Sequence, residues 1–167
     1  MIMAYQHYLP LICILFASTL RFIDTHNAPQ DYVNAHNVVR KQIPGLQPLK
    51  WDPTVAKYAE SYANWRKLDC ALVHSNRDFG KYGENIAIGW GEFSGLDAVK
   101  LWVDEKPDYD YGSNSCLHGK MCGHYTQVVW KNTSLIGCAR AKCFDNMRVF
   151  VTCNYKIPGN WIGEKPY

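Results

Sequence analysis

The spacing of apolar residues predicts two helices in the first half of the chain. Residues 31–43 place apolar side chains at intervals of three and four, with Asp31 as a cap and a Pro-Gly pair as a stop. A second helix starts at Asp52, because Pro53 stands at the first helical position, where its missing N–H costs nothing. This second helix has one apolar face, on which only Arg66 is polar.

A third helix is expected from Ser94 onward. Ser94 is followed three residues later by Asp97, which resembles a capping box with Asp in place of Glu. Apolar side chains then repeat at helical spacing as far as Val103, and Pro107 ends the helix. Residues 89–95 read GWGEFSG, which lacks the glycine spacing of a dinucleotide-binding loop and is interpreted as a turn into the cap.

The last third of the chain has the composition of strands. Residues 126–130 and 148–155 are rich in β-branched and aromatic residues and have the length of a strand. Residues 135–143 are a third candidate strand, and Asp145 with Asn146 indicates a turn before the last one. Helices first and an antiparallel sheet last indicate a compact α+β domain built in layers.

The most apolar run of the chain lies at its N-terminus. The run LPLICILFA at residues 9–17 is followed by small residues, as in a secretory signal peptide, although residues 1–8 contain no Lys or Arg. We therefore expect residues 1–28 to be a signal peptide, cleaved between about residues 18 and 28, and residues 29–167 to form a single domain. The alternative is an uncleaved anchor, for which the run is short.

Composition and charge exclude several classes of protein. With 47% apolar and 20% charged residues, the chain has the composition of a globular domain rather than of a disordered or fibrous protein. The net charge of +3 is too small to indicate nucleic-acid binding, which needs clustered basic residues. We expect a monomer without a nucleic-acid partner.

The cysteines indicate an oxidising compartment. Removal of the signal peptide takes away Cys13 and leaves an even number of cysteines, which behind such a peptide favours disulfides over zinc ligation or a thiol nucleophile. The six are Cys70, Cys116, Cys122, Cys138, Cys143 and Cys153. Their spacing alone leaves all 15 pairings open.

Candidate chemistry rests on two histidines and two glutamates, since the chain has no nucleophile elbow, HExxH motif or phosphate-binding loop. These residues are His74, Glu84, Glu105 and His124. Imidazoles and carboxylates together can bind a divalent cation or move protons. Each histidine closely follows a cysteine, so we expect nearby disulfides to hold both rings. The sequence alone does not bring the four together, and four unrelated polar residues are the alternative.

Several ordered motifs nevertheless carry a resemblance. Residues 123–130 read GHYTQVVW, which resembles the signature of the superfamily of cysteine-rich secretory proteins, antigen 5 and pathogenesis-related 1 proteins. Further segments that agree are AHN at residue 35 with Arg40, LKWD at 49, YGENI at 82, AVKLW at 98 and VTCNY at 151. The end of the chain, from GNWIG at residue 159 to Tyr167, is similar to the plant pathogenesis-related class 1 branch. The resemblance spans about residues 30–167.

The resemblance implies a fold and a disulfide pattern. The fold would be an α-β-α sandwich, in which a central antiparallel sheet lies between helical layers. The family's pairing, laid on these positions, would join Cys70 to Cys143, Cys116 to Cys122, and Cys138 to Cys153. The first of these bridges would tie the helical half of the chain to the sheet.

The resemblance also implies a cleft lined by His74, Glu84, Glu105 and His124. In some relatives this cleft binds zinc or magnesium, and two histidines with two carboxylates are chemically adequate for Zn²⁺. The more ordinary role of such residues is a polar network that stabilises the sandwich. No cofactor is expected to be required.

A second feature of the family is a flexible aromatic loop that binds sterols and lipids. The matching stretch here is residues 107–115, inside a loop expected over residues 107–119, and it carries Tyr109 and Tyr111. Tyrosine offers an apolar ring with a polar tip, which suits a rigid ring system bearing one hydroxyl. The alternative is that both tyrosines pack on their own domain.

Two candidate processing sites complete the sequence features. Some plant members release a C-terminal defence peptide, but their cleavage region has Pro where this chain has Ile157, with Pro158 one position later. Asn132 lies in an Asn-Thr-Ser sequon after a predicted strand, where a glycosylated loop is plausible.

The resemblance implies a secreted plant defence protein, delivered to the apoplast or the vacuole. We expect an antimicrobial and antifungal action by binding sterols or membrane lipids of microbes, without turnover and thus without enzymatic activity. The alternatives are a metal-assisted hydrolase that uses the His/Glu cleft, and a precursor of a C-terminal signalling peptide.

Overall fold

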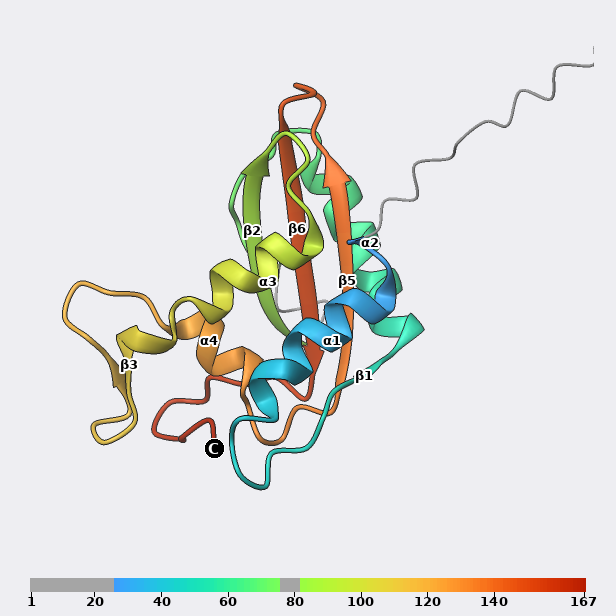
Figure 1. The fold of residues 1–167 in the computed structure, drawn as a ribbon. Helices are drawn as coiled ribbons and strands as arrows, with labels where there is room; N and C mark the ends of the chain where they lie inside the picture. The colour runs from blue at the N-terminus through green and yellow to red at the C-terminus, as the bar shows by residue number, and fades with distance from the viewer. Residues whose placement is uncertain (1–25, 76–81) are drawn as a thin grey trace, which may run out of the picture.

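Residues 26–75 and 82–167 are described by the computed structural model, in which a four-stranded sheet and a small hairpin are combined with four helices (Figure 1). The predicted signal peptide lies outside the described residues as far as residue 25. The helices are α1 (Pro29–Arg40), α2 (Pro53–Arg66), α3 (Gly95–Val103) and α4 (Gly123–Val128). The strands are β1 (Lys50–Trp51), β2 (Gly83–Trp90), β3 (Tyr109–Asp110), β4 (Ser115–Cys116), β5 (Leu135–Lys142) and β6 (Arg148–Lys156).

The main sheet lies between two helical layers. Its strand order is β1-β5-β6-β2, in which β6 runs antiparallel to both of its neighbours while the short β1 runs parallel to β5. Helix α2 covers one face, and α1, α3 and α4 cover the other (Figure 1). The predicted α-β-α sandwich is confirmed, with the parallel β1–β5 pair as the one departure from an antiparallel sheet.

The two faces of the sheet carry separate cores. The larger core lies under α1, α3 and α4 and contains Trp102, Tyr125 and Val151, while the smaller one lies under α2 around Phe150. Helix α2 also approaches β5 closely at Gly137, where a Cβ atom would lie only 2.0 Å from the backbone nitrogen of Ala56. Any larger residue at this position would therefore push α2 away from the sheet.

Two helix starts form as predicted. The carboxylate of Asp52 accepts the N–H groups of Thr54 and Val55, at 2.8 and 2.9 Å, and so caps α2. Ser94 and Asp97 form the expected capping box at the start of α3, with the Ser94 N–H donating to the Asp97 carboxylate at 2.8 Å. Both signals are local, so neighbouring elements are not needed to produce them.

The boundaries of α1 and α3 differ from prediction. Helix α1 begins at Pro29 rather than at residue 31, and the Asp31 carboxylate accepts the Ala28 N–H from the third helical position at 2.9 Å. It ends at Arg40 rather than at residue 43, because the following N–H groups bond three residues back in a tighter turn. Helix α3 ends at Val103, and Pro107 lies in a separate 3₁₀ turn.

The prediction of a strand at residues 126–130 was wrong. This segment is mostly the short helix α4, whose β-branched residues favour a strand only by intrinsic propensity. Two side chains from distant parts of the chain overrule that propensity. The Glu105 carboxylate accepts the first N–H groups of the helix, and the Arg40 guanidinium donates to carbonyls at its end.

Two further elements were missed. Strand β2 was not predicted from the sequence, yet it pairs with β6 along its whole length. Residues 107–119, expected as a plain loop, contain the hairpin of β3 and β4. In both places the pairing partner lies elsewhere in the sheet or hairpin, so composition alone was a poor guide.

The three disulfides have the pairing that the resemblance implied. Cys70–Cys143 joins the end of α2 to the end of β5, and Cys138–Cys153 links directly opposed residues of β5 and β6. Cys116–Cys122 closes a small ring between β4 and the start of α4. No helix among the described residues is long and apolar enough to cross a membrane.

Arg40 joins several segments through one buried side chain. Its guanidinium donates to the carbonyl oxygens of Gln47, Val128, Trp130 and Thr133, at 2.9 to 3.1 Å. The side chain is completely buried, and burial lowers the pKa of Arg40 to about 10, so it stays charged at neutral pH. The helix α1 is thereby tied to the loop before β1 and to the end of α4.

Replacing Arg40 with Met should lower the free energy of unfolding by about 3–5 kcal/mol, because four buried carbonyls would lose their charged donor. Arg40→Lys should recover only part of this loss, since a single ammonium cannot reproduce the guanidinium fork. Urea unfolding of the oxidised protein measures both. The exposed neighbour Lys41 is the control, and Lys41→Met should change stability by less than about 0.5 kcal/mol. A similarly small effect of Arg40→Met would contradict the structural role.

Candidate functional site

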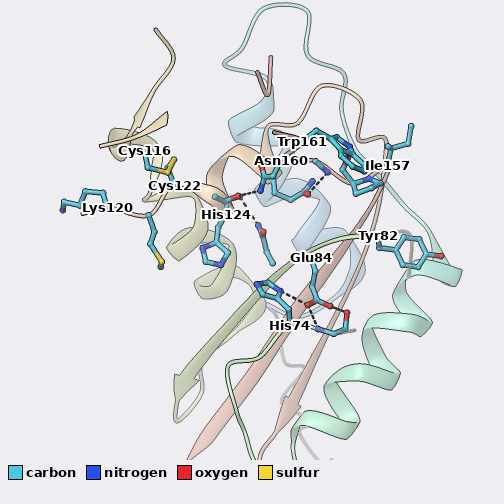
Figure 2. A pocket seen from close by; sticks show the side chains of 17 residues that line it. His74, Tyr82, Glu84, Cys116, Lys120, Cys122, His124, Ile157, Asn160 and Trp161 are labelled. Atoms are coloured by element: carbon cyan, nitrogen blue, oxygen red, sulfur yellow. Dashed lines mark hydrogen bonds and ion pairs between the residues drawn. A yellow bond between two sulfur atoms is a disulfide. The ribbon is translucent and has the colours of Figure 1, made fainter. Parts of the chain in front are cut away.

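A pocket of about 870 Å³ opens where the start of β2, the start of α4 and the chain after β6 meet (Figure 2). We call it the His/Glu pocket. Part of its lining is polar and includes His74, Glu84 and His124. Another part is apolar and comes from Met121, Ile157, Pro158 and Trp161. The pocket thus combines hydrogen-bonding groups and an apolar surface in one cavity.

His74 and Glu84 form the first polar pair of the pocket. His74 Nδ1 donates to Glu84 Oε1 at 2.8 Å, and the His74 side chain is 59% exposed while that of Glu84 is only 7% exposed. Ser75 donates its backbone N–H to the same carboxylate at 2.9 Å and its hydroxyl at 2.5 Å, and Asn154 donates an amide N–H at 3.1 Å. The buried carboxylate therefore orients an exposed imidazole.

These donors decide the charge of Glu84. Burial opposes ionisation and is the largest single influence, but hydrogen bonds from His74, Ser75 and Asn154 together outweigh it, so the pKa of Glu84 is lowered. The carboxylate is ionised at neutral pH, and its bond fixes the proton of His74 on Nδ1. The other ring nitrogen, Nε2, is left to hydrogen-bond with a ligand or solvent.

His124 and Glu105 form the second polar pair. His124 Nδ1 donates to Glu105 Oε1 at 2.6 Å, while Glu105 Oε2 accepts the N–H groups of His124 and Tyr125, at 2.9 and 3.2 Å. Burial acts to raise the pKa of Glu105, but the hydrogen bond and charge of His124 and the two N–H groups lower it overall. The His124 ring also stacks on Trp102, with centroids 6.3 Å apart.

A buried chain of hydrogen bonds supports His124 from behind. Asn85 donates from Nδ2 to the His124 carbonyl at 3.0 Å and to the Tyr155 hydroxyl at 3.1 Å. His36 Nδ1 donates to the Tyr32 carbonyl at 2.7 Å, so its Nε2 accepts the Tyr155 hydroxyl at 2.8 Å. One network therefore connects α1, β6, β2 and α4 at the base of the pocket.

The structure brings the four predicted residues together as two separate His–Glu pairs. Disulfides were expected to hold the histidines, and in the structure a carboxylate bonds each ring directly. The supporting residues His36, Asn85 and Tyr155 were not singled out from the sequence. Nor were Ser75 and the apolar wall, since nothing in the spacing of these residues distinguishes them from other core or surface positions.

The donor set does not make a complete metal centre. Zinc sites in enzymes use at least three protein ligands, whereas both carboxylates here are engaged by N–H and O–H donors. Among residues 26–75 and 82–167, no group of three or more His, Cys, Asp or Glu side chains is placed to hold a metal ion. The two imidazole Nε2 atoms offer at most half of a tetrahedral zinc shell.

Residues 157–167, here called the tail, are fastened along one side of the pocket. Gln127 accepts the Gly159 N–H at 2.9 Å, and the Thr133 hydroxyl donates to the Ile157 carbonyl at 2.7 Å. Gly83 leaves space for Gln127, because a Cβ atom there would lie 2.1 Å from the Gln127 side-chain oxygen. The apolar wall of the pocket thus depends on contacts made by α4 and β2.

The two tyrosines of the predicted sterol loop pack against the tail. Tyr111 stacks on Tyr167 with centroids 5.0 Å apart and donates its hydroxyl to the Tyr167 carbonyl at 2.7 Å. Lys165 Nζ lies 4.1 Å from the centroid of the Tyr111 ring. Tyr109 contacts the rings of Tyr111, Tyr125 and Tyr167. Both rings are therefore engaged by their own domain, the alternative considered from the sequence.

The sequon asparagine lies in an accessible position. Asn132 is exposed and sits in the turn between α4 and β5, not directly after a strand as expected. Its Thr133 neighbour is buried and holds the tail, whereas Ser134, the hydroxyl residue of the sequon, is exposed. Glycosylation of Asn132 stays a prediction.

The geometry can be compared with known proteins. The model of the cysteine-rich secretory protein family matches residues 33–155, a stretch that includes both His–Glu pairs and all six described cysteines. The chain belongs to this family. It is 48% identical over 157 residues to pathogenesis-related leaf protein 4 of Solanum lycopersicum, covering 94% of each chain. It is 46% identical to pathogenesis-related protein 1 of Arabidopsis thaliana, covering 98% of each. These relatives make it a pathogenesis-related defence protein.

Solved structures agree with the fold. Venom allergen-like protein 4 of Schistosoma mansoni is 27% identical, with a TM-score of 0.64, and the match covers 83% of this chain and 92% of that one. A crystal structure of NaASP2 with Zn²⁺ is 25% identical, with a TM-score of 0.70 and 84% of each chain covered. The family sandwich is thus shared across large differences in sequence.

The buried network predicts a specific acid sensitivity. Burial lowers the pKa of His36 from 6.5 to about 4, so the unfolded chain binds one more proton than the folded chain between these values. Stability from this residue is complete above about pH 6.5 and is lost on acidification toward pH 4, by roughly 3 kcal/mol. Glu84 and Glu105, with lowered pKa values, lose their contribution only as the pH falls below their ordinary 4.5.

Urea unfolding between pH 7 and 4 tests this prediction. Wild type should lose stability steadily over that range, whereas His36→Gln should be less stable at pH 7 but change less on acidification. His118, which is exposed, provides the control, and His118→Gln should keep the wild-type pH dependence. Equal slopes for wild type and His36→Gln would show that His36 is not buried in its neutral form.

Proposed function

We propose that this protein is a secreted plant defence protein that captures a sterol or a similar small amphiphile, without turnover, in the His/Glu pocket. The observation that carries the proposal is the lining of that pocket, which is polar at His74, Glu84 and His124 and apolar along Met121, Ile157 and Trp161, while Glu105 supports His124 without lining the cavity. Its volume of about 870 Å³ falls within the usual range of small-molecule sites. Removal of sterol from microbial membranes would account for an antifungal action.

The chemistry of the lining suits a ligand with one polar end. In His74 and His124, Nε2 is the ring nitrogen left to contact a ligand, because each Nδ1 is bonded to a glutamate. A ligand hydroxyl could hydrogen-bond to one of these nitrogens while its apolar rings lie against Met121 and Trp161. Buried carboxylates that are already hydrogen-bonded hold the imidazoles in place without competing for the ligand.

The tyrosine loop is a second contact in this proposal. Tyr109 and Tyr111 remain our predicted sterol-binding residues, but their rings are engaged by Tyr167 and Lys165. Tyr111 is still 43% exposed, but a sterol on this ring would compete with Tyr167 and Lys165. The His/Glu pocket is a cavity with both polar and apolar lining, and for this reason we assign the main binding site to the pocket.

Binding of a fluorescent sterol to the oxidised protein tests the assignment. Met121→Ser/Trp161→Ala should weaken binding at least about tenfold, because two apolar wall contacts are lost. Trp90→Ala, at the far end of the sheet and 70% exposed, is the matched control and should bind like wild type. Tyr109→Ala/Tyr111→Ala should have a smaller effect than the pocket variant. If instead the tyrosine variant alone lost binding, the site would lie on the loop, and no binding by folded wild type would exclude sterol capture.

Two alternatives stay predictions. A metal-assisted hydrolase would show hydrolysis that depends on added zinc and is lost in Glu84→Gln, although the described donor set is incomplete for a metal. A precursor of a signalling peptide would be cleaved near Lys156 and Ile157, which are exposed. Cleavage there would also remove the apolar wall that Trp161 and Ile157 give to the pocket.

A further inference from the structure

Large apolar side chains are exposed around the mouth of the His/Glu pocket. Met121 is 68% exposed and Ile162 is fully exposed, and both belong to short segments that border the cavity. Five such residues come from two segments, residues 117–121 and residues 156–162. They are Leu117, Met121, Ile157, Trp161 and Ile162. We call this group the apolar rim.

The gathering of these residues is unusual for a surface exposed to water. Single exposed apolar residues are common, but a contiguous group usually marks a binding surface. Both segments line the His/Glu pocket, through Met121 and Trp161. Trp161 also lines a smaller neighbouring cavity of about 360 Å³, together with Ile162. Figure 2 shows Lys120 on one side of the cavity and Ile157 and Trp161 on the other.

The charge of the two segments is one-sided. Residues 117–121 read LHGKM and residues 156–162 read KIPGNWI, with two lysines and no Asp or Glu. Lys120 lies 3.9 Å from the Asp108 carboxylate, but its own side chain is 59% exposed. Lysine beside exposed Trp, Ile, Leu and Met is the combination that suits a lipid–water interface, since the ammonium can reach head groups while its stem stays apolar.

We propose that the apolar rim docks on the surface of an anionic lipid bilayer, so that the His/Glu pocket opens toward the lipid. This inference rests on the proposed sterol capture, because a sterol must leave a membrane to enter the pocket. The two segments carry Lys120 and Lys156 and no acidic residue of their own, and this positive charge favours an anionic surface over a second copy of this chain, whose rim would carry the same charge. Met121, Ile157 and Trp161 of the rim line the pocket itself, so docking of the rim would spare the ligand an exposure to water.

A second exposed apolar group provides a matched control. Trp90, Phe144 and Met147 lie at the opposite end of the main sheet and are 63 to 70% exposed. They are contiguous, because Trp90 pairs with Arg148 in the sheet and the Gly91 N–H donates to the Met147 carbonyl. Arg148 is paired with Asp145 there, and Lys67 Nζ lies 5.7 Å from the centroid of the Phe144 ring, so this group tests whether exposed apolar side chains near any cation are sufficient for binding.

Flotation with sterol-free vesicles tests the docking surface. Wild type should bind phosphatidylcholine vesicles that contain phosphatidylserine, and added salt should weaken this binding. Leu117→Ser/Ile162→Ser should bind at least about tenfold more weakly, although neither residue lines the His/Glu pocket. Trp90→Ser/Phe144→Ser should bind like wild type. Circular dichroism confirms that both variants are folded, which is expected because all four side chains are exposed.

The outcomes separate docking from sterol capture. Loss of vesicle binding in the Trp90/Phe144 variant but not in the Leu117/Ile162 variant would overturn the assignment of the rim. A change of oligomeric state in the Leu117/Ile162 variant, without a change in vesicle binding, would make the rim a contact between copies and also overturn it. A wild type that binds soluble sterol but not vesicles would refute docking alone, whereas one that binds vesicles but no sterol would refute the proposed function alone.

Discussion

A single buried guanidinium connects the parts of the molecule that form the pocket. Arg40 reaches from α1 to the carbonyl oxygens at the end of α4 and beyond, where a helix of six residues would not persist by itself. The opposite end of α4 is held by the Glu105 carboxylate, which also orients His124. Two charged side chains therefore stabilise the two ends of the same helix, and the position of His124 depends on both.

The polar and apolar sides of the pocket have different kinds of support. The polar side is held by buried carboxylates and by the network from His36 through Tyr155 and Asn85, in which every bond has a defined donor. Most of the apolar side belongs to the tail, which is fastened by hydrogen bonds to Gln127, Thr133 and Gly123. The hydrogen-bonding groups are thus placed by buried contacts within the sandwich, while most of the apolar wall is held by a segment on its surface.

The sequence predicted those elements whose signals lie within them. The caps at Asp52 and Ser94, the strands β5 and β6 and the turn at Asp145 were all read correctly. Helix α4 and strand β2 were not, because Arg40, Glu105 and the partner strand β6 act on them from far along the chain. The four His and Glu residues could be grouped only through the family resemblance, and so could the disulfide pairing. That the tail would stack on Tyr111 through Tyr167 had no signal in the sequence.

The disulfide between Cys116 and Cys122 has a consequence for how this family can diversify. The bridge spans only six positions, and the ring it closes carries Leu117, Lys120 and Met121. Because the disulfide fixes both ends of this ring, its side chains can be substituted without unfolding the domain. Relatives could thus come to differ in their ligand or membrane preference through substitutions within this ring, while the histidines and their glutamates stay unchanged.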